Sequence, residues 1–217
     1  MAEFAVIWDM DGVLVDSTKN IWDSFNKLLK PHGIQFSDED IKKYLGRSLR
    51  DQIASWKERW DINLEVEKFS KEAGEAELEV MEKKADKNLL KLLNELKKNK
   101  VPMGVGTSSL RWRAEKILDL LEIKDYFSVL VTAEDVTNHK PNPDIFLKVG
   151  EKLGVKPENC VVIEDAASGI EAAKRGNMKA IGYLTKYHKK SELEKADLVI
   201  ENFSDISLSK IHKMFKD

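Results

Sequence analysis

The sequence contains one cysteine and almost no net charge, and it lacks any long apolar run. Cys160 has no second cysteine to pair with, so an internal disulfide is excluded, and its neighbours Val161–Ile163 predict a buried structural thiol. The 36 basic and 38 acidic residues nearly cancel, which gives no overall attraction to nucleic acid or to an anionic membrane. No segment reaches the roughly 18 continuous apolar residues of a membrane span, and Glu3 and Asp9 come too early for a signal peptide. We therefore expect a cytoplasmic protein without nucleic-acid or membrane partners.

The sequence does contain enough apolar material for a core, because 42% of its 217 residues are hydrophobic. Short apolar runs alternate along the chain with amphipathic helical patterns. These runs are too short for helices and too apolar for exposed strands, which predicts strands buried on both faces. The expected strands are Phe4–Trp8, Met103–Gly106, Phe127–Val131, Val161–Ile163, Ala180–Tyr183 and Leu198–Ile200. The expected helices are Asn88–Asn99, Trp112–Leu121, Pro143–Leu153 and Ser168–Arg175, the last ending in a glycine cap at Gly176. This alternation predicts an α/β fold with a Rossmann-like parallel sheet and helices on both faces.

One region interrupts the alternation. Residues 17–84 show helical periodicity and no convincing strand, and we expect Trp22, Trp56 and Trp60 to form part of a helical core there. The segment beginning at Ser37 has the composition of a capping box. The sequence thus predicts a core domain made of residues 1–16 and 85–217, with an all-helical domain inserted at 17–84. Because the insertion follows the first strand directly, we expect it over that strand's carboxyl end, where open α/β sheets bind ligands.

Polar side chains follow several of the predicted strands at the point where each strand ends. They are carboxylates, small hydroxyls and one lysine in a stiff loop: Asp9, Asp11, Thr107, Ser108, Ser109, Lys140, Glu164 and Asp165. Each set alone is ordinary, since strands often end in polar turns, hydroxyls cap helices and loop lysines are usually solvated. In a parallel sheet, however, all these strand ends lie on one edge. We therefore expect residues that are scattered in the sequence to converge on one site.

The residue types at this edge suit phosphate chemistry. Carboxylates from two strands are hard oxygen ligands appropriate to Mg²⁺. The lysine and a hydroxyl would balance the remaining charge of a phosphate. One aspartate is then free to attack phosphorus, and the other to donate a proton to the leaving oxygen and later to accept one from water.

These residues stand in segments that resemble the four ordered motifs of the haloacid dehalogenase superfamily, in its phosphatase and phosphomutase branch with a helical cap. The segments are DMDGVLVD, GVGTSSLR, HKPNPDIF and VVIEDAASGIEAAKRG. The resemblance implies Asp9 as nucleophile and metal ligand, and Asp11 as acid/base whose main-chain carbonyl also binds Mg²⁺. It further implies Thr107 as a phosphoryl contact, Lys140 as the charge balancer, and Asp165 with Glu164 as the remaining metal ligands. Ser108 and Ser109 are expected to bind substrate. An aspartate at position 11 implies phosphoryl transfer and not dehalogenation.

The resemblance also assigns roles within the insertion. Residues 17–84 correspond to the family's helical cap, which closes over the site and excludes bulk water. The segment GRSLRD resembles the substrate-facing cap loop, with Arg50 where relatives place a substrate-binding arginine and Arg47 as its neighbour. A solvated basic turn is the alternative interpretation. The branch's β-phosphoglucomutases carry a cap histidine where this chain has Ile21, which favours a hydrolase over a mutase.

We therefore predict a Mg²⁺-dependent phosphatase that hydrolyses a small phosphomonoester, of the sugar phosphate or phosphoglycolate type, through an aspartyl-phosphate intermediate. A β-phosphoglucomutase-like phosphomutase is the alternative. A receiver-type phosphorylation switch also clusters acids, a hydroxyl and a lysine at strand ends, but it lacks both the Asp-x-Asp-Gly turn and a helical insertion. A non-catalytic binding protein is disfavoured because every residue needed for the chemistry is present. We expect a monomer or a weak homodimer.

Overall fold

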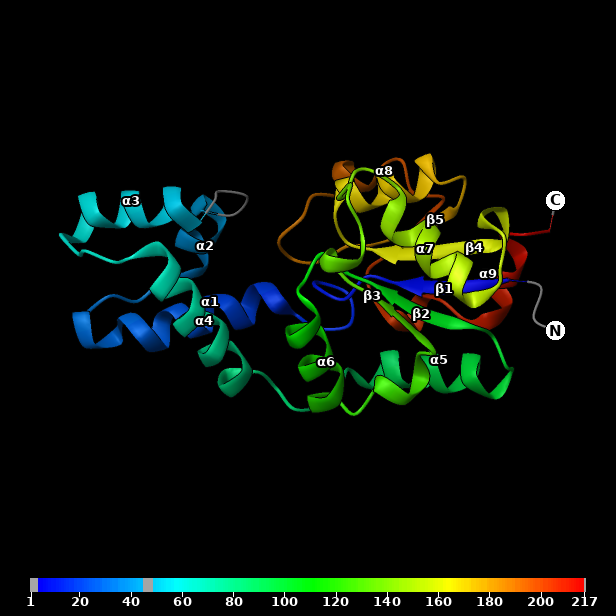
Figure 1. Cartoon of the computed structure of the whole chain (residues 1–217), viewed down its shortest axis with the longest axis horizontal. Coiled ribbons are helices and arrows are strands. Elements are labelled where there is room, and N and C mark those ends of the chain that lie inside the picture. The colour runs from blue at the N-terminus through cyan, green and yellow to red at the C-terminus, as the bar shows by residue number, and fades with distance from the viewer. Residues whose placement is uncertain (1–3, 45–48, 217) are drawn as a thin grey trace. The chain divides into compact units, whose positions relative to one another are not determined.

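A computed structural model describes residues 4–44 and 49–216 of the chain (Figure 1). The chain divides into two compact units, one made of Met1–Val15 with Lys83–Asp217 and the other of Asp16–Glu82. The first unit contains the sheet. The second contains helices, and no strand occurs among its described residues.

The sheet of the first unit is entirely parallel and has the strand order β3-β2-β1-β4-β5-β6. Its strands are β1 (Ala5–Trp8), β2 (Met103–Gly106), β3 (Val129–Val131), β4 (Cys160–Glu164), β5 (Lys179–Tyr183) and β6 (Leu198–Ile200). From β1 the chain adds β2 and β3 on one side, and then β4, β5 and β6 on the other side. The switch point therefore lies between β1 and β4, and open α/β sheets bind ligands at such a point. The predicted α/β class and Rossmann-like parallel sheet are confirmed.

The edge strands differ from the prediction of burial on both faces. The central strands β1, β2 and β4 are buried along their whole length, whereas β3 and β6 each have two half-buried residues out of three. An edge strand has a neighbour on one side only, so part of its surface stays accessible. Phe127 and Ser128, assigned to a strand by the sequence, precede β3.

Helices cover both faces of the sheet. They are α5 (Lys87–Lys98), α6 (Arg111–Leu120), α7 (Asp144–Leu153), α8 (Ala167–Arg175) and α9 (Leu208–Lys213), with short 3-10 turns at Lys124–Tyr126, Ala133–Asp135, Pro157–Asn159, Lys190–Leu193 and Phe203–Asp205. Helix α7 packs on β1, β2 and β3, and α8 packs on β4 and β5, while α5 lies on the opposite side of the sheet from α8 (Figure 1). Gly104 permits the close approach of α7, because a Cβ there would lie 2.6 Å from Val149 Cγ1.

The end of α8 confirms the predicted glycine cap. Gly176 is the C-cap residue, but its φ is −80° and its backbone is not left-handed. The left-handed residue is Asn177, with φ 56°. Asparagine tolerates this conformation better than most residues with a side chain.

The second unit consists of α1 (Ser17–Leu29), α2 (Asp38–Tyr44), α3 (Leu49–Trp60) and α4 (Val66–Val80), with a 3-10 turn at Lys30–His32. Asp16 caps α1, since its Oδ1 accepts a hydrogen bond from the Lys19 amide at 3.1 Å. The expected capping box is present: the Asp40 amide donates to Ser37 Oγ at 3.2 Å and the Ser37 amide to Asp40 Oδ2 at 3.1 Å.

An aromatic cluster forms the core of this helical unit. Trp56 is fully buried and its ring lies 4.8 Å from that of Phe36 and 6.3 Å from that of Trp22, centroid to centroid. Trp60 is only half-buried, and its ring carries the Arg59 guanidinium 4.3 Å from its centroid. The predicted core role is thus confirmed for Trp22 and Trp56, while Trp60 lies at the core's margin.

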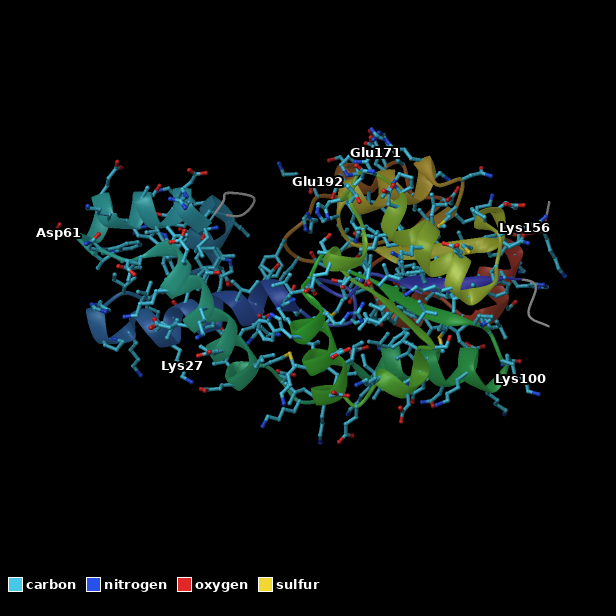
Figure 2. The ribbon with its side chains drawn as sticks, in the orientation of Figure 1. Lys27, Asp61, Lys100, Lys156, Glu171 and Glu192 are labelled. Atoms are coloured by element: carbon cyan, nitrogen blue, oxygen red, sulfur yellow. The ribbon has the colours of Figure 1, made fainter. Side chains whose placement is uncertain are left out.

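Many charged side chains lie on the surface of each unit. Figure 2 shows Lys27 and Asp61 pointing outward from the helical unit and Lys100 and Lys156 from the sheet unit, and all four are exposed. The thiol of Cys160 is buried, as predicted, and burial raises its pKa to about 12. No helix among the described residues is long and apolar enough to cross a membrane.

Candidate active site

The candidate site begins in the tight turn that follows β1. The Asp9 amide donates to the Ile163 carbonyl at 2.9 Å, which continues the pairing of β1 with β4 by one residue. Gly12 then has φ 80°, and its amide donates to the Val15 carbonyl at 2.8 Å. This left-handed position suits glycine. The turn places Asp9, which is 5% exposed, and the half-buried Asp11 at the carboxyl edge of the sheet.

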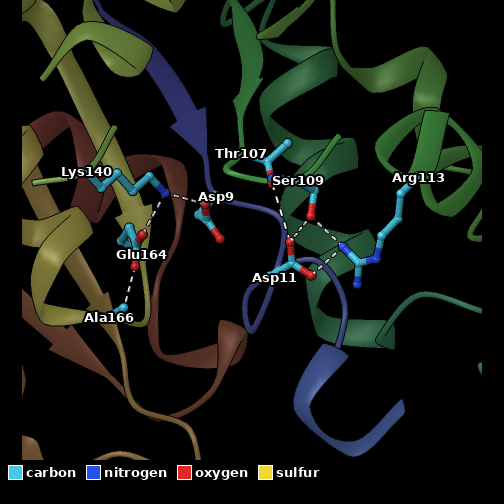
Figure 3. Close-up of polar contacts among 8 residues, drawn as sticks. All are labelled: Asp9, Asp11, Thr107, Ser109, Arg113, Lys140, Glu164 and Ala166. Atoms are coloured by element: carbon cyan, nitrogen blue, oxygen red, sulfur yellow. Dashed lines mark hydrogen bonds and ion pairs between the residues drawn. The ribbon is translucent and has the colours of Figure 1, made fainter. Parts of the chain in front are cut away.

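Lys140 reaches Asp9 from the long loop after β3. Its Nζ lies 2.5 Å from Asp9 Oδ1 and 2.8 Å from Glu164 Oε1 (Figure 3). The ammonium also lies 4.7 Å from the centroid of the fully buried Phe146 ring. Two carboxylates and an aromatic face therefore surround a lysine whose side chain is only 8% exposed. Such an enclosure compensates the burial of a positive charge.

Three carboxylates meet beside this lysine. One oxygen of each of Asp9, Glu164 and Asp165 lies within 4.8 Å of the others. Two glycines make room for them: a Cβ at Gly12 would lie 1.9 Å from Asp165 Oδ2, and a Cβ at Gly169 would lie 1.8 Å from Glu164 Oε1. Hard oxygen ligands gathered in this way fit a divalent cation.

The electrostatics of the carboxylates favour a bound cation. Burial raises the pKa of Asp9 from 3.8 to about 8; Lys140 opposes this effect, and Glu164 and Asp11 add to it. Burial likewise raises the pKa of Asp165 to about 9, assisted by the negative charges of Glu164 and Asp9. Burial alone would lower the pKa of Lys140, but Asp9 and Glu164 more than offset it and the pKa is raised. One lysine therefore does not compensate three ionised carboxylates, and a further cation would be needed to keep Asp9 and Asp165 ionised at neutral pH.

Asp11 has a separate set of partners, on the side of β2 and α6. Ser109 Oγ donates to Asp11 Oδ2 at 2.7 Å, and Thr107 Oγ1 lies 3.4 Å from the same oxygen. Arg113 Nη1 donates to Asp11 Oδ1 at 2.8 Å and to Ser109 Oγ at 2.5 Å. In Figure 3 the carboxylate of Asp11 faces Ser109 and Arg113, while Lys140 and Glu164 lie on the other side of Asp9. The two aspartates thus contact different cations.

The structure brings together most of the residues singled out by the sequence. They come from the ends of β1, β2 and β4 and from the loop after β3: Asp9, Asp11, Thr107, Ser109, Lys140, Glu164 and Asp165. Ser108 is exposed and has no polar contact among the described residues. Arg50, in the helical unit, forms an ion pair with Glu67 at 3.2 Å in which both side chains are largely exposed. Arg47 lies outside the described residues.

Two residues at the site escaped the sequence analysis. Arg113 stands on α6 outside the motifs, and a helical pattern does not reveal which way its side chain turns. His188 follows β5; its Nε2 lies 3.7 Å from Asp165 Oδ2 and its Nδ1 lies 2.8 Å from Glu192 Oε2. His188 could have been placed near the site only from the parallel topology. It follows β5, which is the neighbour of β4, so both strands end at the same edge of the sheet.

The fold and these strand ends define a Rossmann-like α/β protein with an acidic site at the carboxyl edge of its parallel sheet. Residues 6–183 match the family described as haloacid dehalogenase-like hydrolase, and the chain therefore belongs to that family. It is an enzyme of the phosphatase type.

Curated relatives and solved structures agree with this assignment. The chain is 30% identical to validoxylamine A 7'-phosphate phosphatase of Streptomyces hygroscopicus subsp. limoneus, over 92% of this chain and 94% of that protein. It is 31% identical to the phosphorylated carbohydrates phosphatase of Thermotoga maritima, over 82% of this chain and 83% of that protein. A crystal structure of a putative beta-phosphoglucomutase from Thermotoga maritima superimposes with a TM-score of 0.80 at 28% identity, covering 98% of each chain.

Proposed function

We propose that the protein is a Mg²⁺-dependent phosphatase that hydrolyses a small phosphomonoester, of the sugar phosphate or phosphoglycolate type, through a phosphorylated Asp9. The observation that carries this proposal is the division of the two turn aspartates. Asp9 belongs to the buried carboxylate cluster beside Lys140, whereas Asp11 is held apart by Ser109 and Arg113. The phosphatases among the relatives support the substrate class.

In the first half of the proposed reaction, a carboxylate oxygen of Asp9 attacks phosphorus and the bond from phosphorus to the leaving oxygen breaks. Asp11 gives its proton to that oxygen, so the product leaves as an alcohol. Lys140 stays beside Asp9 and balances negative charge near the phosphoryl group. The hydroxyl of Thr107, adjacent to Asp11, supplies a donor for a phosphoryl oxygen.

In the second half, water attacks the phosphorus of the aspartyl phosphate and the bond from phosphorus to Asp9 breaks. Asp11, now a carboxylate, accepts a proton from that water. The cycle releases inorganic phosphate and restores both aspartates.

The carboxylates of Asp9, Glu164 and Asp165 would hold Mg²⁺, together with the main-chain carbonyl of Asp11 that the resemblance implies. Their oxygen chemistry and the space kept by Gly12 and Gly169 support this assignment. Bound there, Mg²⁺ supplies positive charge for a phosphate dianion and for the negative charge that develops during transfer.

We assign the helical residues 17–84 as a cap that excludes bulk water during turnover, with residues 1–16 and 85–217 as the core domain. Ser108, Ser109, Arg50 and Arg47 remain predicted substrate contacts. A cytoplasmic location and a monomer or weak homodimer also remain predictions.

A phosphomutase is the second candidate, because a solved relative is described as a putative beta-phosphoglucomutase. Ile21, which stands where the resemblance implies a mutase histidine, disfavours it. A mutase would convert β-glucose 1-phosphate to glucose 6-phosphate without net release of phosphate.

A phosphate-release screen over sugar phosphates, phosphoglycolate and nucleotide monophosphates tests the proposal, with Mg²⁺ or with EDTA. We expect release from at least one ester that requires Mg²⁺ and is abolished in Asp9→Asn. Asp16→Asn is the matched control: Asp16 caps α1 through the Lys19 amide, and asparagine caps helices equally well. Release that survives Asp9→Asn would refute the mechanism, and isomerisation of glucose phosphates without release would establish the mutase instead.

A further inference from the structure

Arg113 touches the acid/base candidate but belongs to none of the motifs. It lies in the first turn of α6, and its side chain is only 14% exposed. We propose that Arg113 is a positioning residue that, together with Ser109, fixes the carboxylate of Asp11 for proton transfer to the leaving oxygen. This inference rests on the proposed phosphatase function.

The contacts form a closed triangle. Arg113 Nη1 binds Asp11 Oδ1 at 2.8 Å, Ser109 Oγ binds Asp11 Oδ2 at 2.7 Å, and Arg113 Nη1 also donates to Ser109 Oγ at 2.5 Å. Each carboxylate oxygen of Asp11 therefore has its own donor, and the two donors hold one another. Such an arrangement fixes the rotation of the carboxylate, which a single donor would leave free.

The position of Arg113 differs from that of a surface arginine on the same helix. Arg111 pairs with Asp135 at 2.5 Å and lies 3.8 Å from Glu115, and its side chain is 39% exposed. Exposed pairs of this kind contribute little. Arg113, by contrast, is largely removed from solvent and directs its charge to an aspartate of the catalytic turn, and a buried guanidinium requires such a partner.

The charges around the site give Arg113 a second significance. Lys140 contacts Asp9 and Glu164, and its charge lies beside a cluster that also contains Asp165. Because Arg113 compensates Asp11 separately, Lys140 and a divalent cation would have only the other three acids to compensate. The arginine thus keeps the carboxylate that transfers protons apart from the carboxylates proposed to bind the metal.

This geometry has a consequence for the first half-reaction. When Asp11 gives its proton to the leaving oxygen, it becomes the carboxylate that Arg113 and Ser109 bind best. Arg113 should therefore matter most for esters whose leaving group needs a proton. An ester that leaves as a stable anion, such as p-nitrophenyl phosphate, needs little help from Asp11.

The test compares the two kinds of ester on the full chain with Mg²⁺. We expect Arg113→Gln to lower kcat/KM about 100-fold for an alkyl phosphate that the wild-type protein hydrolyses. The pre-steady-state release of p-nitrophenolate from p-nitrophenyl phosphate should change less than about 3-fold, because that leaving group departs without a proton. Arg113→Lys keeps the charge but not the planar fork, and should lose activity on the alkyl ester to an intermediate extent.

Arg111→Gln is the matched control, since it removes the same charge from the same helix without touching Asp11, and both esters should react as in wild type. Circular dichroism and melting curves verify that each variant is folded. Equal losses on both esters, or no loss on either, overturn the role of Arg113 and leave the phosphatase intact. Failure of the wild-type protein to hydrolyse any ester overturns the proposed function and this role with it.

Discussion

Replacing Gly12 by alanine tests whether the turn after β1 is built around the carboxylate of Asp165. At φ 80° an alanine costs about 1–2 kcal/mol. For a chain of this size each kcal/mol lowers Tm by about 2–4 °C, so strain alone predicts a fall of about 2–8 °C. The new Cβ would also lie 1.9 Å from Asp165 Oδ2, a separation that real Cβ atoms do not show.

The magnitude of the displacement follows from that distance. To reach ordinary van der Waals contact at 3.4 Å, the Asp165 oxygen must move by about 1.5 Å. Mg²⁺ accepts ligands only close to about 2.0–2.1 Å, so a shift of that size would remove Asp165 as the proposed ligand. We expect the Kd for Mg²⁺ to rise at least about 10-fold.

Gly154→Ala provides the control, because Gly154 has φ 69° and an added Cβ would meet nothing within 4 Å. Both variants should therefore melt at a lower temperature, but only Gly12→Ala should bind Mg²⁺ more weakly. Isothermal titration with Mg²⁺ measures the difference. If the two variants bind Mg²⁺ equally well, the turn does not shape the carboxylate cluster and the reasoning fails.

Three further predictions follow from other contacts. Gly169→Ala places a Cβ 1.8 Å from Glu164 Oε1, so it should weaken Mg²⁺ binding in a titration even though alanine favours helix; unchanged affinity would contradict this. Lys140→Met leaves buried acids without their cation and should cost about 3–5 kcal/mol, a fall in Tm of roughly 6–20 °C by calorimetry in EDTA; an unaltered Tm would refute it. Arg59 and the Ser37 amide lower the pKa of Asp40 from 3.8 to about 2, so the stability that Asp40 adds is present above about pH 4 and is lost as the pH falls to about 2. The difference in urea midpoint between wild type and Asp40→Asn should shrink over that range, and a constant difference would exclude the ion pair as its source.

The strand ends of the site were accessible from the sequence because two simple facts combine. A buried strand is recognisable as a short apolar run, and parallel strands end on the same edge. Asp9, Glu164 and Lys140 could therefore be grouped before any coordinates, although Lys140 follows β3, two strands away from β1. Their convergence depends on topology and not on fine detail.

Arg113 could not be found in the same way. Its approach to Asp11 depends on the rotation of α6 about its axis, which is set by packing against the sheet. The sequence does not predict the partial exposure of β3 and β6 for a related reason. The local pattern of a strand does not reveal whether that strand lies at the edge of the sheet. Asn177 follows the C-cap of α8 and has a left-handed backbone with φ 56°, which asparagine tolerates.

The contact between Lys140 and Asp9 joins residues 131 positions apart in the chain, and that between Arg113 and Asp11 spans 102. Contacts of such sequence separation form late, because the entropy of closing long loops must be overcome before they exist. A refolding chain would thus regain helical signal well before it regains turnover. Activity would therefore report completion of the sheet, because these long-range contacts bring the proposed catalytic residues together.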